Sequence, residues 1–251
     1  MTEALLTTIR PESAVAAIHT GWTDCDFDLA AFSPLADSGI ARAVFRRLPN
    51  QTPSLAPAAE QHPVAARYVL DAPTHPEPAT LRHWHALGVR GLRLTLTDDA
   101  SQAGDLLRTA DAIAPLDWHL ELTLAPHLAS LQPFEWTLTC LPVAICLGGL
   151  ADFAAHRDLD DPDLGFILEL LEMGRTWIKL SPTASGDTDT ALVAAFAAEA
   201  IAVRPDRIVW GSGRHGQASI GHALAELTRW IPDRAIRDTI LTVNPAQLYR
   251  F

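Results

Sequence analysis

Short apolar runs alternate with longer amphipathic segments along most of this 251-residue chain. Eight of the short runs have the length and β-branched content of strands, and the segments between them repeat with the 3.6-residue period of helices. Strands that alternate with helices pair in parallel, because each helix returns the chain to the same edge of the sheet. The expected strands are Ala14–His19, Ala41–Leu48, Ala66–Asp71, Gly91–Leu96, Trp118–Leu124, Val143–Leu147, Thr176–Ser181 and Arg207–Gly211.

Eight such units in about 250 residues are typical of one α/β barrel of the (β/α)8, TIM type. We therefore expect residues 1–251 to form a single barrel domain, whose weakly patterned N-terminal part is distorted or shortened. Asp161 before Pro162 has the pattern of a helix N-cap, and Gly88 and Gly174 stand where helices should end. The expected helices are Pro78–Leu87, Ser101–Ala114, Asp163–Met173, Thr188–Val203 and Gln217–Ile231.

Composition excludes several classes of function. Thirty acidic residues against 19 basic ones give a net charge of −11, and no cluster of Lys or Arg marks a surface for nucleic acid or anionic membrane. No apolar run approaches the roughly 20 residues of a membrane-spanning helix. Three cysteines, without a C-x-x-C pair, predict a reducing compartment and hence the cytoplasm. Cys146 is expected on the outer face of its strand as an inert thiol.

Three of the expected strands carry one apolar and one polar face. Successive side chains on a strand point to opposite faces, and the apolar face should pack on the helices. The polar face would then point into the barrel with Arg93, His119, Glu121, Lys179 and Ser181. Unpaired buried charges are costly, so these residues form either a structural ion cluster or a polar cavity that opens at the carboxyl ends of the strands. We favour the cavity, which would make it a binding or catalytic site.

Four segments resemble the amidohydrolase-related family of metal-dependent hydrolases, and within it the 2-pyrone-4,6-dicarboxylate hydrolase-like group of lactonases. Gly88–Arg93 reads GVRGLR, Trp177–Ser181 reads WIKLS, Arg207–Ser212 reads RIVWGS, and Asn244–Phe251 reads NPAQLYRF. These segments occur in the family's order and spacing. The resemblance implies a barrel fold, a hydrolytic activity and substrate carboxylates bound by arginines. In this group, lactone opening can proceed without a tightly held metal.

The chain departs from the family pattern where metal ligands are expected. The opening H-x-H motif is reduced to His19, Leu147 stands where a histidine belongs, and Gly213 replaces the aspartate of the last strand. We therefore expect no metal centre and no cofactor. A weak divalent site that uses His19 or His215 stays open at this point.

These observations predict a metal-independent hydrolase that acts on a small anionic lactone, ester or amide at the carboxyl-terminal end of the barrel. Lys179 would stabilise the developing oxyanion, and His119 with Glu121 would transfer protons. An alternative interpretation of His119 is a hydrogen-bonded core residue. The guanidinium fork of arginine suits carboxylates. The expected substrate-binding residues are Arg93, Arg90, Ser181, Arg214 and His215.

Two alternatives belong to other classes. Lys179, the only lysine of the chain, could form a Schiff base with a carbonyl substrate in a lyase reaction. Alternatively, the barrel could be a degenerate, non-catalytic family member that binds a small anion or a protein partner. An imine trapped on Lys179 would support the lyase, and the absence of turnover would support the binding protein.

Overall fold

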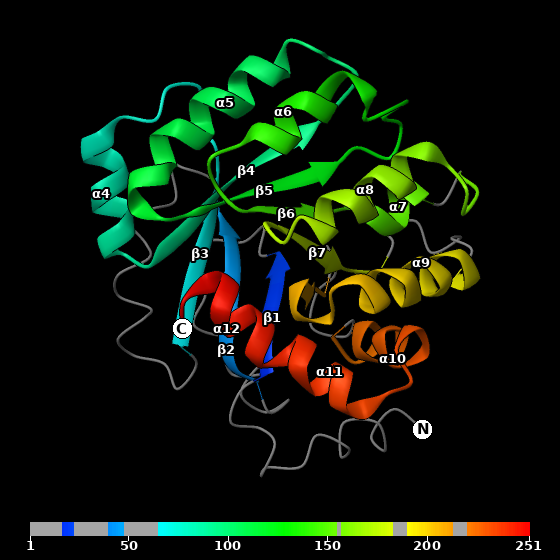
Figure 1. Ribbon diagram of the computed structural model, residues 1–251. Coiled ribbons are helices and arrows are strands. Elements are labelled where there is room, and N and C mark those ends of the chain that lie inside the picture. Colours follow the sequence, from blue (N-terminus) through cyan, green and yellow to red (C-terminus); the bar gives the residue numbers. More distant parts are fainter. Residues whose placement is uncertain (1–16, 23–39, 48–64, 155–156, 183–189, 213–219) are drawn as a thin grey trace.

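A computed structural model describes residues 17–22, 40–47, 65–154, 157–182, 190–212 and 220–251 of the chain. Its centre is a sheet of eight parallel strands that follow one another in chain order (Figure 1). Each region expected to form a strand contains one. The strands are β1 (Ala17–Trp22), β2 (Ile40–Arg47), β3 (Ala65–Asp71), β4 (Val89–Leu96), β5 (His119–Leu124), β6 (Ile145–Gly148), β7 (Thr176–Leu180) and β8 (Ile208–Trp210).

The strands pair side by side from β1 to β8, and every pairing is parallel. The alternation of strand and helix in the sequence thus predicted the α/β class and the strand order. A ladder between β8 and β1, which full barrel closure requires, is not among the pairings of the described residues. The described part of the chain therefore shows a parallel sheet that curves as an open barrel.

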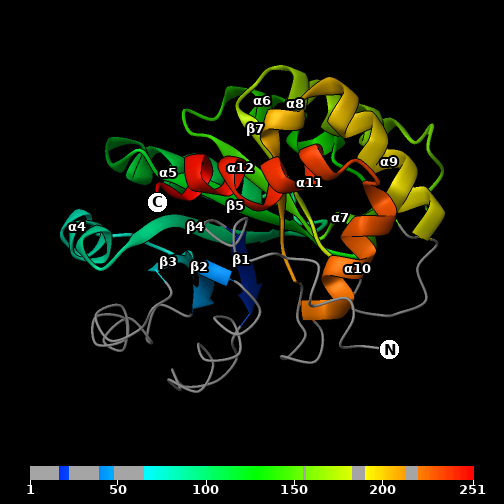
Figure 2. The same ribbon diagram turned by 90° about the horizontal axis from the view of Figure 1, so that it is seen from below.

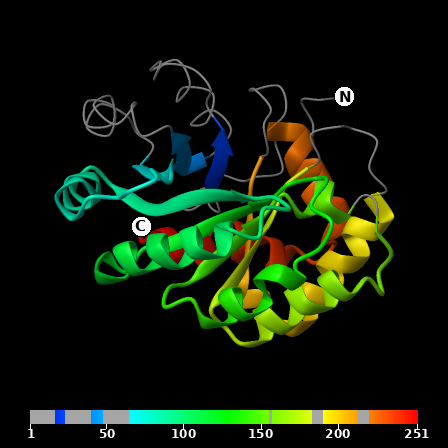
Figure 3. The same ribbon diagram turned by 90° about the horizontal axis from the view of Figure 1, so that it is seen from above.

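Helices cover the outside of this sheet from β3 onward. The blue strands β1 and β2 lie on the opposite side of the molecule from α5, α6 and α8 (Figure 3). None of the described helices combines the length and apolarity needed to cross a lipid bilayer. The α-helices are α4 (Pro78–Ala86), α5 (Gln102–Ile113), α6 (Glu135–Cys140), α7 (Leu150–Ala154), α8 (Pro162–Glu172), α9 (Thr190–Val203), α10 (Ile220–Trp230), α11 (Arg234–Leu241) and α12 (Val243–Tyr249).

Local signals in the sequence explain where several helices begin and end. The Asp161 carboxylate accepts a hydrogen bond from the Asp163 amide and caps α8, as predicted. Gly88 and Gly174 follow helices with φ angles of +95° and +84°. This left-handed backbone is the form that glycine adopts without strain, so both glycines end a helix directly before a strand.

The core has an outer and an inner part. Alternate leucines and isoleucines of β4, β5 and β7 pack outward on the helices, as predicted from the two-residue period. A smaller inner cluster lies inside the curved sheet and includes Val44, Val69, Cys146 and Trp177. Cys146 thus points inward, and the prediction of an outer-face thiol was wrong. Burial raises the pKa of this thiol to about 12, so it is inert as a nucleophile.

The C-terminal helix α12 completes the inner cluster at the amino ends of the strands (red in Figures 1 and 2). Leu248 and Tyr249 belong to this cluster, and the Tyr249 ring meets the ring of His119, the first residue of β5. Helix α12 therefore packs side chains into the hollow of the sheet near its amino end.

Candidate active site at the carboxyl ends of the strands

A cavity of about 390 Å³ lies at the carboxyl ends of the strands and is walled by the loops that follow them. This is the end at which barrel enzymes carry their active sites. Its charged lining includes Arg46 from β2, Arg93 from β4, Glu121 from β5 and Lys179 from β7. Of the four ionisable residues expected to share one volume, Arg93, Glu121 and Lys179 line this cavity. Ser181, directly after β7, also lines the cavity.

Lys179 and Glu121 form an ion pair across the floor of the cavity. The Lys179 Nζ atom lies 2.5 Å from Glu121 Oε2, and their side chains are 13% and 9% exposed. Such a shielded pair fixes the position of the ammonium group, because breaking it would leave a buried charge uncompensated. An ammonium bound by a carboxylate also differs from the free amine that imine formation requires. The geometry therefore does not favour the Schiff-base alternative.

Arg93 is held on three sides. Its guanidinium donates to Thr123 Oγ1 at 2.9 Å, to Asp71 Oδ1 at 2.9 Å and to Thr95 Oγ1 at 3.2 Å. Arg46 donates to the same Asp71 carboxylate from the other side, with its Nε atom 3.1 Å from Oδ1. A guanidinium has five N–H donors, so Arg93 keeps donors beyond the three that bind its neighbours. The resulting arginine pair is oriented for an anion in the cavity.

Sequence reasoning missed Arg46 and Asp71, although the two-residue alternation contains the signal. Val44 and Val69 belong to the inner cluster, and the residue two positions further along each strand points the same way. These residues are Arg46 and Asp71, close to the carboxyl ends of β2 and β3. Applying the face argument to these two strands would have placed both residues near the cavity.

His119 does not line this cavity, which corrects the prediction that it joins Glu121 there. It is the first residue of β5, one layer closer to the amino end than Glu121, and only 3% of its surface is exposed. Burial lowers the pKa of His119 to about 4; the Glu121 carboxylate opposes this shift, whereas Lys179 and Arg250 add to it. A shared face on a strand is therefore no guarantee of a shared site.

Arg90 also lies away from the cavity. Its guanidinium donates to the carbonyl oxygens of His85 and Val89 at the start of β4. Arg214 and His215 lie outside the described residues. His19 belongs to β1, but its side chain is outside the described part. Of the five expected substrate-binding residues, the structure thus places Arg93 and Ser181 on the cavity.

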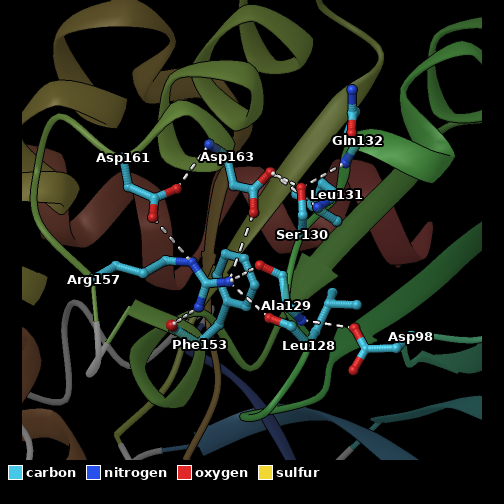
Figure 4. A network of polar contacts seen from close by, with 10 residues as sticks. All are labelled: Asp98, Leu128, Ala129, Ser130, Leu131, Gln132, Phe153, Arg157, Asp161 and Asp163. Carbon is cyan, nitrogen blue, oxygen red and sulfur yellow. Dashed lines mark hydrogen bonds and ion pairs between the residues drawn. The ribbon is translucent and has the colours of Figure 1, made fainter.

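One wall of the cavity is the loop after β5, which carries His127. A network of polar contacts fixes the next residues of this loop (Figure 4). Arg157 donates to the carbonyls of Leu128 and Ala129, at 2.7 and 3.0 Å, and Asp98 accepts from the amide of Ala129 at 2.7 Å. This clamp holds the loop from two sides. His127 directly precedes the clamped residues, and sequence reasoning missed it because it lies beyond the strand.

The same network ties the loop to helix α8. Asp163, in the first turn of that helix, accepts hydrogen bonds from the Leu131 amide at 2.9 Å and from Ser130 Oγ at 3.1 Å (Figure 4). Arg157 also makes ion pairs with Asp161 and Asp163. The wall of the cavity is therefore braced by a rigid helix, as a binding site with fixed geometry requires.

Among the described residues, two carboxylates near the cavity are already bound by cationic side chains. The Glu121 carboxylate is bound by Lys179, and the Asp71 carboxylate is bound by two arginines. Leu147, at the position where the family pattern has histidine, is fully buried in the outer core. Within the described ranges, no group of three His, Cys, Asp or Glu side chains is arranged to hold a metal ion.

The fold and this site define the class of protein. The amidohydrolase family matches residues 55–251, so the chain belongs to that family and is a hydrolase-type enzyme. A 2-pyrone-4,6-dicarboxylate hydrolase from Comamonas testosteroni is 24% identical over 254 residues, which cover 91% of this chain and 82% of the relative. A D-galactarolactone isomerase from Agrobacterium fabrum is 35% identical over 102 residues, which cover 36% of this chain and 35% of the isomerase.

A solved structure shows the same fold. It is described as a probable 2-pyrone-4,6-dicarboxylic acid hydrolase from Acinetobacter baumannii with citric acid bound. It superposes with a TM-score of 0.75 at 18% identity and covers 94% of this chain and all of its own. At this identity, the likeness concerns the architecture alone.

Proposed function

We propose that the protein is a metal-independent hydrolase of a small anionic lactone, with esters and amides as chemically related substrates. The observation that carries this proposal is the convergence of Arg46, Arg93 and Lys179 on one cavity at the carboxyl ends of the strands. Three cationic side chains in a volume of about 390 Å³ suit a small molecule with more than one carboxylate.

The activities for which these relatives are named narrow the class of substrate that we propose. One acts on a lactone with two carboxylates, another on a sugar-acid lactone, and the solved structure holds the tricarboxylate citric acid. All three small molecules carry carboxyl groups. In the proposal, Arg93 and Arg46 bind one substrate carboxylate, and Asp71 holds both guanidinium groups in position through its ion pairs with them.

The proposed reaction is attack of water on the lactone carbonyl. The water oxygen bonds to the carbonyl carbon, negative charge develops on the carbonyl oxygen, and Lys179 stabilises it. His127 replaces His119 as the proposed general base: it accepts the proton of the water and returns it to the ring oxygen as the C–O bond breaks. Glu121 holds Lys179 in place through the ion pair.

The proposal includes a closed (β/α)8 barrel made by residues 1–251 as one domain. Helix α11 contacts both β1 and β8, the first and last strands of the sheet, and thereby supports closure between them. Cysteine usage remains the basis for expecting a cytoplasmic protein.

The test combines metal analysis with a substrate panel. Purified, chelator-treated protein is assayed with 2-pyrone-4,6-dicarboxylate and galactarolactones by absorbance and chromatography. We expect hydrolysis without added metal, loss of activity in Lys179→Met and His127→Gln, and no change in Arg108→Gln, which alters an exposed arginine of α5. Restoration of activity only by zinc or manganese would contradict metal independence. Ligand binding without turnover by any substrate would favour the non-catalytic alternative.

A further inference from the structure

A second cavity, of about 290 Å³, lies at the opposite, amino-terminal end of the strands. Three arginines line it: Arg175 before β7, Arg207 before β8 and Arg250 after α12. Asp117 is the acidic residue of this lining and binds Arg250. The described lining thus carries a surplus of positive charge.

Two of these arginines are already oriented by neighbours. Arg207 donates to the Gly174 carbonyl at 3.0 Å, lies 4.6 Å above the Trp177 ring and forms an ion pair with Asp206 at 3.2 Å. Arg250 is bound by Asp117. Arg175 is exposed and makes one long contact, of 3.4 Å, with the Thr139 carbonyl. The cavity therefore offers two fixed cations and one that can adjust to a ligand.

His119 also lines this second cavity, and its imidazole gives the strongest sign of an absent partner. Only 3% of the residue is exposed, and the ring nitrogens have no well-aligned hydrogen-bond partner among the described residues. The Arg90 backbone lies near enough to interact with the ring and to oppose the lowering of its pKa. Buried polar groups almost always have a partner, because leaving one unsatisfied is costly. Gly91 makes room for the ring: a Cβ atom there would lie 2.8 Å from His119 Nε2. The chain thus accommodates a polar ring in a position that an apolar side chain could fill.

The surroundings of the cavity are positive too, although the whole chain carries a net charge of −11. Arg67 donates to the Arg250 carbonyl, and Arg42 and Arg67 both stack on the Phe251 ring. Burial lowers the pKa of Arg67 and that of Arg90, and repulsion from neighbouring arginines adds to both shifts. Cationic groups crowded together in this way gain stability from an anion bound among them.

We propose that the amino-terminal cavity is a second ligand site, which binds a small anion bearing carboxylate or phosphate groups. Arg175, Arg207 and Arg250 bind the charged oxygens, and the ligand lies against the wall that contains His119. This site is separate from the proposed active site, so its ligand is not the substrate in transit through the reaction. It goes beyond the proposed function and does not depend on it.

The test uses inorganic phosphate and citrate as probes in calorimetric titrations. Arg93→Gln removes one of the two arginines of the carboxyl-end cavity and so weakens anion binding there. In this background we expect saturable binding of at least one probe, and the probe that binds identifies phosphate or carboxylate chemistry. Adding Arg175→Gln should weaken that binding about tenfold, the effect of losing one charge-assisted hydrogen bond. Adding Arg108→Gln is the matched control and should leave it unchanged.

Nuclear magnetic resonance gives an independent readout at His119. Its imidazole signal is identified by its loss in His119→Gln, and we expect it to shift on titration with the bound probe. Three results would overturn the proposal: no saturable binding of either probe, binding that Arg93→Gln abolishes, or equal weakening by Arg175→Gln and Arg108→Gln. A His119 signal that does not move at saturation would also overturn the part assigned to that residue.

Discussion

Buried polar groups differ in their hydrogen-bond and ion-pair partners between the two ends of the sheet. At the carboxyl end, Lys179 is paired with Glu121, and Arg93 is paired with Asp71. At the amino end, the ring nitrogens of His119 have no well-aligned hydrogen-bond partner among the described residues, and the Arg90 backbone lies near enough to oppose the lowering of its pKa. Paired charges have fixed positions, so they can bind a substrate in one orientation. An unpartnered ring among cations costs stability unless something else binds it. The contrast indicates that the carboxyl end is preorganised, whereas the amino end is completed by a ligand.

The largest effect is expected from the pair at the carboxyl end. Lys179→Met removes the ammonium group and should lower kcat/KM on the lactone substrate by about 10²- to 10³-fold, as for the loss of an oxyanion donor. It also leaves the Glu121 carboxylate unpaired, which should destabilise the fold by roughly 3 kcal/mol.

The double variant Lys179→Met/Glu121→Gln separates these two effects. Removing both charges should recover most of the stability in urea unfolding without recovering activity. Activity that returns together with stability would show that Lys179 acts only as a structural group.

At the amino end, pH provides the sharper test. The unfolded histidine binds a proton below about pH 6.5, whereas buried His119 stays neutral down to about pH 4. The unfolded state therefore holds more protons in this window, and the free energy of unfolding must fall as the pH falls from 6.5 to 4. The shift corresponds to a loss of about 3 kcal/mol.

His119→Leu should remove this part of the pH dependence. We expect the wild-type protein to lose about 3 kcal/mol more than the variant between pH 7 and pH 4, measured by urea unfolding at each pH. Parallel stability curves for the two proteins would mean that His119 titrates normally, and the contrast between the two ends would weaken.

A smaller effect is expected from the clamp behind the carboxyl-end cavity. Arg157→Leu removes the donors to the Leu128 and Ala129 carbonyls and should cost about 2 kcal/mol in unfolding free energy. Amide hydrogen exchange at Leu131 should accelerate as the loop loosens. Arg157→Lys is the matched variant, since it keeps the charge without the planar fork. Unchanged exchange in both variants would show that Asp98 and Asp163 suffice to hold the loop.

The smallest effect concerns substrate binding. Arg93→Lys keeps a positive charge near Asp71 but cannot reproduce the three fixed directions of the guanidinium. We expect KM for a dicarboxylate lactone to rise about tenfold with a smaller change in kcat, because the interaction is made in ground and transition states alike. An equal loss in kcat would instead assign Arg93 to the chemical step.

The sequence predicted the sheet well, because strand and helix periods are local signals. It also predicted which face of β4, β5 and β7 points inward, since the two-residue alternation there is clean. Position along the strand was harder to predict. His119 shares a face with Glu121 but starts its strand, so it belongs to the other end of the hollow. The expected start of this strand, Trp118, is one residue from the observed start, so the error came from treating a shared face as a shared cavity without counting how far along the strand each residue lies.

Two further errors have physical causes. Around Cys146 both faces of the strand are apolar, so the sequence did not show which face points inward; the structure places Val143, Ile145 and Leu147 in the outer core and Cys146 in the inner cluster. Tyr249 packs against His119, which is far from it in the sequence, and no local sequence pattern predicts such a contact. The packing at the amino ends of the strands therefore could not be predicted from the hydrophobic periodicity of the sequence.

The Tyr249 ring lies between His119 at the amino end and Lys179 at the carboxyl end. Tyr249 meets His119 edge to face at 5.1 Å between ring centroids, and its centroid lies 5.7 Å from Lys179 Nζ. A ligand that displaces this ring from either side changes the surroundings of the group beyond it. By thermodynamic linkage, an anion at the amino end and a substrate at the carboxyl end must then alter each other's affinity by the same factor. Tyr249→Leu should abolish that reciprocity.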